Sequence, residues 1–197
     1  MGRPRTFDVD QVLDAAVVTF WERGYTGTSL ADLLDATGLS RSSLYAAFGD
    51  KEGLFLAVLD RYLERVVDFV LGPLEAEGAD LDTLMRTFTG LGSSAKDAPM
   101  AFGCLIAHSG SERARLDEAV HKRVVAHQER MEAAYANVLR GAQRAGQLGP
   151  EASVDELAAM LTVFTRGLVT QIRAGADPVS LAASTRAIVA LLRQDRT

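Results

Sequence analysis

Apolar residues recur at helical spacing along almost the whole 197-residue chain, and this periodicity constrains the fold more than any other feature. The first clear example is residues 8–23, whose apolar face consists of Val12, Leu13, Ala16, Val17 and Phe20. This segment begins with Asp8 and Gln11, which have the spacing of a capping box, and it ends at Gly24. We find no convincing run of alternating β-branched residues with hairpin turn signals. The sequence therefore predicts an all-α fold of about nine helices.

Capping residues, glycines and prolines divide the rest of the chain into further predicted helices. A short helix capped by Thr28 or Ser29 is expected to precede a third helix at about 41–48. Asp50 then starts a longer helix that is expected to end near 72–73, at a Gly-Pro pair. The later helices are predicted from Asp80 to the 90–94 turn region, from Pro99 through His108, over about 113–146, from Ser153 to about Gly175, and from Asp177-Pro178 onward.

Composition limits the class of protein and its compartment. Hydrophobic residues make up 48% and charged residues 24%, which is the balance of a globular protein with a packed core. The single cysteine, Cys104, cannot form a disulfide within the chain, and one thiol with three scattered histidines is too few for a structural zinc site. The longest apolar runs, such as 187–192, are far shorter than the roughly 20 residues that span a bilayer. We therefore expect a cytoplasmic protein with no membrane partner and no metal.

Residues 28–48 have the pattern of a helix, a tight turn and a second helix. Gly38 can adopt the left-handed conformation that ends one helix, and Ser40 can cap the next. In a helix-turn-helix motif, the second helix enters the DNA major groove while the first crosses the backbone. Here Leu44 and Phe48 are expected to face inward and the polar residues outward. Because the net charge is −5, DNA binding must depend on a local arrangement of cations.

Several spacings in this region resemble the N-terminal signature of the tetracycline-repressor (TetR) family of bacterial transcription regulators. The matching residues are Thr28-Ser29-Leu30, Gly38-Leu39-Ser40, Leu44-Tyr45 with Phe48, and Lys51-Glu52-Gly53-Leu54. The match covers about residues 8–60. The resemblance implies an Ω-shaped homodimer that binds double-stranded operator DNA through a helix-turn-helix domain, predicted over 1–50. The domain predicted over 51–197 would bind a small-molecule effector and dimerise through its last two helices.

The candidate DNA contacts combine this resemblance with the chemistry of the residues. Arg3 and Arg5 flank a proline and form a short basic arm suited to a minor groove. The resemblance implies that Thr28 or Ser29 and Lys51 bind phosphates, that Tyr45 touches backbone or base, and that 41–43 face base edges. Taken alone, each capping hydroxyl is more often only a cap, and Tyr45 could be a half-buried core residue. The predicted DNA-binding set is Arg3, Arg5, Thr28, Ser29, Arg41, Ser42, Ser43, Tyr45 and Lys51.

Cys104 and His108 are four residues apart on a predicted helix and would share one face. A thiol beside a cation ionises readily, so this pair could sense oxidants or electrophiles. Some TetR-type regulators with a similar Gly-Cys-Leu-Ile stretch sense electrophiles at that cysteine, and the resemblance keeps this alternative open. We expect instead that Cys104 is a small buried hydrophobe, because the surrounding sequence is apolar.

Other chemical motifs give no indication of an enzyme. Glu118 and His121 form one Glu-x-x-His unit, but a di-iron bundle needs two units and further glutamates. A surface pair of charged residues explains them better. We find no glycine-rich phosphate loop, nucleophile elbow or paired carboxylate site in the sequence. The chain is therefore predicted to be a binding protein without a cofactor.

The C-terminal part carries candidates for an effector pocket and for dimerisation. Apolar and aromatic residues on several helices could converge on one cavity, with Arg86, His108, Gln128 or Arg166 available for a polar group of the ligand. The predicted pocket residues are Phe69, Phe88, Met100, Phe102, Cys104, His108, Met131, Tyr135, Met160 and Phe164. The predicted dimer contacts are Leu168, Leu181, Ile188 and Leu191. The preferred function is a DNA-binding repressor released by a mostly apolar effector; a helical small-molecule carrier is the alternative.

Overall fold

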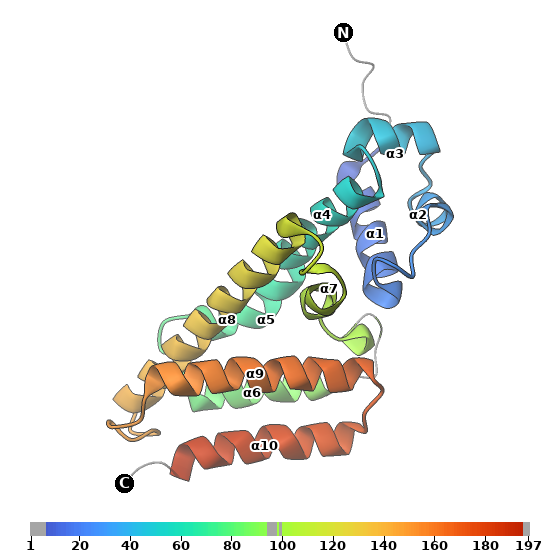
Figure 1. The fold of residues 1–197 in the computed structure, drawn as a ribbon. Helices are drawn as coiled ribbons and strands as arrows, with labels where there is room; N and C mark the ends of the chain where they lie inside the picture. The colour runs from blue at the N-terminus through green and yellow to red at the C-terminus, as the bar shows by residue number, and fades with distance from the viewer. Residues whose placement is uncertain (1–6, 94–97, 99, 195–197) are drawn as a thin grey trace.

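The computed structural model describes residues 7–93, 98 and 100–194 of the chain (Figure 1). Over these residues all regular secondary structure is helical, which confirms the predicted all-α class. The predicted basic arm, Arg3 and Arg5, lies outside the described residues. If the continuous run from Lys51 to Glu75 is taken as one helix, the described part of the chain contains nine α-helices, as predicted.

Four helices form the N-terminal part: α1 (Val9–Arg23), α2 (Leu30–Thr37), α3 (Arg41–Phe48) and α4 (Lys51–Tyr62). Ser29 and Asp32 form a full capping box at the start of α2, so Ser29 rather than Thr28 is its cap. At α1 the Asp8 carboxylate accepts from Asp10 N at 2.9 Å, and the box expected with Gln11 is replaced by this shorter cap. The predicted ends of these helices therefore differ little from the observed ones.

The helix that leaves the N-terminal part is longer than predicted. After α4 it continues through a π-helical segment, η1 (Leu63–Val67), into α5 (Asp68–Glu75). Pro73 lies inside α5 instead of ending it. A proline removes only one backbone hydrogen bond, and the helix stops two residues later, so the cost at this position is small. The predicted end near 72–73 is wrong by one short turn.

Two predicted boundaries in the C-terminal part are wrong. The expected helix over 99–108 is divided into a 3₁₀ turn, η3 (Met100–Phe102), and α7 (Leu105–Arg113), because Gly103 adopts φ +73° between them. The expected helix over 113–146 is also shorter, since α8 spans Glu118–Arg144. Asp117 caps α8 by accepting from Ala119 N and Val120 N. The remaining helices are α6 (Leu81–Ser93), α9 (Val154–Arg173) and α10 (Pro178–Gln194).

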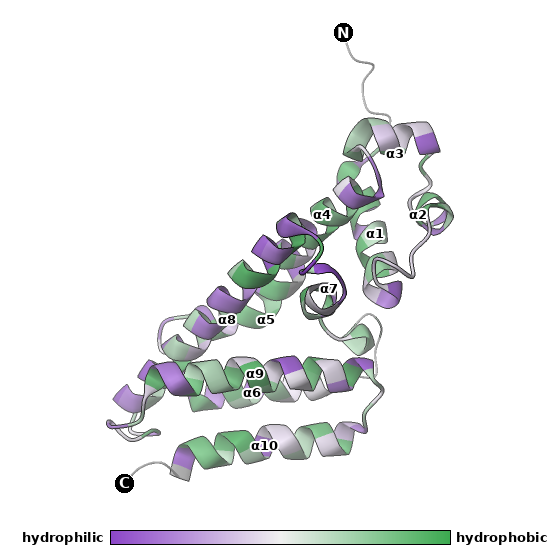
Figure 2. Cartoon of the chain, in the orientation of Figure 1, coloured by the Kyte–Doolittle hydropathy of each residue, from purple (hydrophilic) through white to green (hydrophobic). Residues whose placement is uncertain are grey.

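The helices are arranged so that α3 lies at the opposite end of the molecule from α9 and α10 (Figure 1). The helices α4 and α8 run along the length between these ends. One buried aromatic group joins α1 to α4, with the Phe20 and Tyr25 ring centroids each 4.9 Å from that of Phe55. Polar residues recur along α8, whereas α10 is mostly apolar between its ends (Figure 2). The fold therefore separates a small N-terminal helical unit from a larger helical body.

Candidate DNA-binding surface and effector cavity

Helix α3 presents a polar face next to a buried anchor. Ser40 caps the helix by accepting from Ser43 N at 3.1 Å. Leu44 is fully buried, as predicted, while Arg41 is exposed and the Tyr45 residue is 44% exposed. Ser42 is also exposed and Ser43 is partly exposed. The N-terminal turns of α3 thus offer a guanidinium, hydroxyls and a phenol to a partner on the molecular surface.

The two candidate phosphate hydroxyls before α2 have different environments. Thr28 is buried, and its hydroxyl donates to Gly24 O at 2.6 Å. Ser29 is exposed at the helix start, where its hydroxyl donates to the Asp32 carboxylate. Of the two residues, only Ser29 lies on the surface.

Contacts within the protein hold the Lys51 side chain in place, unlike a lysine that is free to bind a phosphate. Its ammonium donates to Tyr25 O at 2.7 Å and lies 4.1 Å from the centroid of the Tyr25 ring. Burial lowers the pKa of Lys51 below its usual value. The side chain therefore ties the start of α4 to the turn after α1, a role that its sequence position did not indicate.

The N-terminal unit is held to the body by Glu112 of α7. One carboxylate oxygen accepts from Tyr25 N at 3.0 Å, and the other accepts from Thr26 N at 2.6 Å. Burial would raise the pKa of Glu112, but these two hydrogen bonds hold it below its usual value. His108 lies one turn away, with its Nδ1 3.8 Å from the Glu112 carboxylate. We call Glu112 with its two amide donors the Glu112 clamp.

A second joint lies at the end of α1. Trp21 Nε1 donates to Gly103 O at 2.9 Å, directly before α7. The Arg173 guanidinium, at the end of α9, donates to Trp21 O, Glu22 O and Phe102 O at 2.8–3.0 Å. This arrangement fixes α1, the η3 segment and α9 to one another. Gly103 is therefore bonded directly to α1, and Phe102 is linked to α1 through Arg173.

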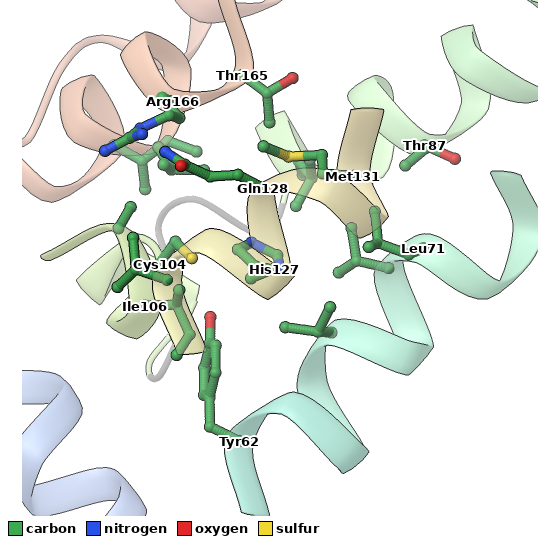
Figure 3. Close-up of a pocket in the computed structure, with 18 of the residues that line it drawn as sticks. Tyr62, Leu71, Thr87, Cys104, Ile106, His127, Gln128, Met131, Thr165 and Arg166 are labelled. Atoms are coloured by element: carbon green, nitrogen blue, oxygen red, sulfur yellow. The ribbon is translucent and has the colours of Figure 1, made fainter. Parts of the chain in front are cut away.

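The body contains an apolar cavity of about 70 Å³ between α4, η1, α5, α6, α7, α8 and α9 (Figure 3). Its lining residues are Tyr62, Val67, Val70, Leu71, Thr87, Leu91, Met100, Gly103, Cys104, Ile106, Ala107, Val124, His127, Gln128, Met131, Tyr135, Thr165, Arg166, Val169 and Ile172. Four of the predicted pocket residues are among them: Met100, Cys104, Met131 and Tyr135. The Tyr135 and Thr165 hydroxyls share a hydrogen bond of 2.6 Å.

The other six predicted pocket residues lie outside this cavity. Phe88 is fully buried in the core, where its ring centroid is 5.7 Å from that of Phe164. Phe102 is partly buried against the core, and Met160 is exposed on α9. Phe69 is 84% exposed. Helical spacing put these side chains on apolar stretches, but the way the helices cross determines which of them reach the cavity.

Cys104 and His108 do not form the reactive pair that their spacing allows. Cys104 is the N-cap residue of α7 instead of lying within the helix, and its side chain faces the cavity. Burial raises the pKa of the Cys104 thiol, although hydrogen bonds with the Ala107 backbone and with Tyr62 partly offset this effect. His108 instead packs beside Gly24 and Glu112, and burial lowers the pKa of its imidazole. Both shifts oppose a thiolate beside an imidazolium at neutral pH.

His127 is an ionisable cavity residue that the sequence analysis did not identify. Its Nδ1 is buried without a hydrogen-bond partner among the described residues. Burial, together with the nearby charges of Arg130 and Arg166, lowers the pKa of His127 to about 4. A signal was present in the sequence, because His127 follows Val120 and Val124 on the inward face of α8. A histidine at helical spacing within an apolar stripe marks a polar group in the core.

A surface groove adjoins the cavity between α5 and α6. It encloses about 750 Å³, and its walls include the exposed Phe69 and Arg86. Val70, Thr87, Leu91 and Met100 line both the groove and the cavity. These four side chains therefore form the wall that separates the cavity from the surface at this point.

The candidate dimer contacts are divided between the core and the surface. Leu168 and Leu181 are buried within the protomer, and Ile188 is partly buried. Leu191 is 61% exposed. Two other apolar residues are also exposed: Val163 of α9 (71%) and Val179 of α10 (72%). The outward apolar side chains of these two helices are therefore mostly different from those that the sequence singled out.

The described residues contain neither of two features that would change the class of protein, a metal site and a membrane-spanning helix. The described ranges contain no group of three His, Cys, Asp or Glu side chains placed to hold a metal ion. Glu118 lies 3.6 Å from Lys122 Nζ on the surface of α8, and His121 is exposed. No helix in the described part of the chain is long and apolar enough to cross a membrane.

Comparisons with known proteins identify the family. Residues 12–58 match bacterial regulatory proteins of the tetR family, and residues 81–188 match the tetracyclin repressor-like C-terminal domain. The chain belongs to the TetR family of bacterial transcriptional regulators. The TetR N-terminal match runs past the predicted boundary at residue 50 and ends within α4.

Relatives of this TetR regulator cover most of its length. The HTH-type transcriptional repressor ComR of Escherichia coli strain K12 is 33% identical over 179 residues, which is 89% of this chain and 84% of ComR. The HTH-type regulator YezE of Bacillus subtilis strain 168 is 34% identical over 162 residues, which is 82% of this chain and 84% of YezE. A solved structure of the TetR regulator CifR, a cysteine mutant complexed with 26-base-pair operator DNA, has a TM-score of 0.84 at 28% identity. The structural match covers 97% of this chain and 100% of the CifR chain.

Proposed function

We propose that this TetR regulator is a repressor that binds a near-palindromic operator as a homodimer and is released by a small, mostly apolar effector. The exposed polar face of α3 carries the DNA-binding part of the proposal. Repression is supported by the names of relatives such as ComR, and operator binding by the CifR complexes. The proposal places the protein in the cytoplasm, where DNA is accessible.

In this proposal α3 reads base edges from the major groove. Arg41 lies in the first turn, where a guanidinium can donate two hydrogen bonds to a guanine. Tyr45 lies one turn further along, and Ser29 faces the surface at the start of α2. Two copies of α3 in a dimer would enter successive major grooves about 34 Å apart. The operator should therefore consist of two half-sites separated by one helical turn.

The test begins with selection of bound fragments from genomic DNA by the full chain. Footprints of Arg41→Ala and Tyr45→Ala are then compared with that of Arg144→Ala, which removes an exposed arginine in the last turn of α8. A lost base-edge contact costs about 1 to 3 kcal/mol, so affinity should fall roughly 10- to 100-fold for the α3 variants only. Unchanged footprints for both α3 variants would refute this use of α3.

The outward apolar side chains of α9 and α10 support a dimer interface there. Val163, Val179 and Leu191 are large, exposed and apolar, and Gly167 allows close approach of a second helix pair. Val163→Arg should give monomers in sedimentation and abolish protection of a full operator. Val18→Arg is the matched control, because Val18 is a 47% exposed valine on α1, in the N-terminal unit. A Val163→Arg dimer that still protects the operator would contradict this assignment.

The effector part of the proposal is supported by residues that both line the cavity and contact the N-terminal unit. Gly103 lines the cavity while its carbonyl accepts from Trp21, and α7 carries both Cys104 at its start and the Glu112 clamp. An occupant that displaces the η3–α7 segment would therefore reorient the N-terminal unit. The N-terminal unit would then have two orientations, one that binds DNA and one that does not. The effector can shift the equilibrium between them only by the difference in its affinity for the two.

Two alternatives make different demands on the same cavity. A carrier protein would bind the small molecule but would show no salt-dependent shift of selected DNA in a gel. A regulator that senses electrophiles through Cys104 would lose DNA on alkylation of that residue. The raised pKa of the Cys104 thiol favours the non-covalent effector.

A further inference from the structure

The charges around the cavity are unbalanced. None of the twenty described residues that line it is acidic, and Arg166 is the one among them with a permanent positive charge. His127 is neutral at pH 7, because burial and nearby cations lower its pKa to about 4. Arg166 has no ion pair with any described residue. A cation next to an apolar cavity is stabilised when an anion enters that cavity.

Polar side chains that can bond to a ligand gather on one side of the cavity. In Figure 3, Arg166, Gln128 and Cys104 lie at one side, while Leu71 and Thr87 lie at the other. The hydroxyls of the lining are already engaged, since Tyr62 is bonded to Cys104, Tyr135 is bonded to Thr165, and Thr87 donates to Thr83 O at 3.1 Å. The cavity thus has a hydrogen-bonding end and an apolar end, which is the pattern of a site for an amphipathic molecule.

The apolar end continues toward the surface. The wall formed by Val70, Thr87, Leu91 and Met100 is shared with the 750 Å³ groove between α5 and α6. A cavity of about 150 Å³ holds benzene in another protein, so 70 Å³ is too small for a ring without movement of the lining. A linear chain is narrower and can pass between flexible side chains such as Met100 into the groove.

We propose that the cavity binds a monocarboxylate with a linear alkyl chain, held at the carboxylate by Arg166 and Gln128 and directed through the shared wall toward Phe69. The guanidinium and the amide donate to the carboxylate oxygens, and neutral His127 can donate its one ring N–H. The alkyl chain contacts Val70, Leu71 and Leu91. This inference rests on the proposed function, because it specifies the chemistry of the effector.

Binding is measured on the full chain without DNA, by calorimetry and by the fluorescence of Trp21, the only tryptophan of the chain. The indole is bonded to Gly103 O at the cavity wall, so occupancy should change its emission. Octanoate should bind at least 10-fold more tightly than 1-octanol and than benzoate. Affinity should rise about 10-fold for every two methylenes from butyrate to octanoate, since each buried methylene adds to the transfer free energy.

Variants test which residue holds the carboxylate. Arg166→Met should reduce octanoate affinity to that of 1-octanol, and Arg166→Lys should restore much of the difference. Arg144→Met is the matched control, because it removes an exposed arginine in the last turn of α8 that does not line the cavity. Circular dichroism and the unfolding midpoint establish that each variant is folded. Equal binding of octanoate and 1-octanol, or unchanged octanoate affinity in a folded Arg166→Met, would overturn the inference.

DNA release separates this inference from the proposed function. If octanoate binds as described but leaves selected DNA bound, the ligand chemistry stands and the effector role fails. If uncharged compounds release the DNA and carboxylates do not, the effector role stands and the ligand chemistry is wrong.

Discussion

The Glu112 clamp gives the sharpest prediction about how the two parts of the protein are joined. Its carboxylate accepts from Tyr25 N at 3.0 Å and from Thr26 N at 2.6 Å. Hydrogen bonds to a charged group contribute about 1.5 to 3 kcal/mol each. Glu112→Gln leaves one neutral acceptor and turns an amide donor toward a backbone N–H, so it should cost about 2 kcal/mol.

Two measurements follow from this estimate. For a chain of this size, about 2 kcal/mol corresponds to a fall of about 4 to 8 °C in the unfolding midpoint. If the loss is local, hydrogen exchange at the Tyr25 and Thr26 amides should be about 30-fold faster, since 1.4 kcal/mol is tenfold. Glu132→Gln makes the same chemical change at an exposed position of α8 and serves as the control.

The reasoning fails if, in Glu112→Gln, the Tyr25 and Thr26 amides exchange hydrogen at the original rate and the unfolding midpoint equals that of Glu132→Gln. In that case the carboxylate would be bonded to water instead of to the turn after α1. The proposed coupling of the cavity to DNA would then depend on the Trp21 and Arg173 contacts alone.

Three further outcomes are expected. Iodoacetamide should label Cys104 more slowly in the native protein than in urea and faster as the pH rises, because burial raises the pKa of the thiol; rapid labelling at pH 7 with loss of DNA would favour a sensor. The pKa of His127 is about 4 when folded and about 6.5 when unfolded, so the unfolded chain binds the proton first and stability falls by up to about 3 kcal/mol between pH 6.5 and 4. Urea titrations of His127→Gln at pH 7 and 4.5 should lack this part of the pH dependence, and an unchanged dependence would contradict it. Phe69→Ser should leave the unfolding midpoint within about 1 °C, whereas Phe88→Ala should cost about 3 to 5 kcal/mol; equal losses would contradict their assigned burial.

Local signals in the sequence were sufficient to predict where several helices begin and end. The predicted range 41–48 coincides with α3, because Ser40 caps one end and Gly49 follows the other. Ser153 likewise starts α9 by accepting from Glu156 N. These caps act within three or four residues, so they can be identified without knowledge of the tertiary structure.

The region around Cys104 could not be predicted in the same way. Gly103 ends the expected helix, and a Cβ at this position would lie 2.5 Å from Val169 O of α9. The requirement for glycine therefore comes from a contact with a helix more than 60 residues away. Apolar periodicity indicates which face of a helix is buried, but it does not show which buried residues surround a cavity. The predicted pocket set mixed cavity residues with core residues such as Phe88 for this reason.

The π-helical segment Leu63–Val67 has a consequence for recombining this chain with its relatives. Each π turn contains one residue more than an α turn, so it rotates the downstream helix by about 100° relative to the upstream one. The upstream part packs on α1 and the downstream part on α8. A chimera joined after Phe48, or after Glu75, would keep both faces in phase. A chimera joined inside 63–67 with a partner that lacks the extra residue would point the apolar face of α5 away from α8.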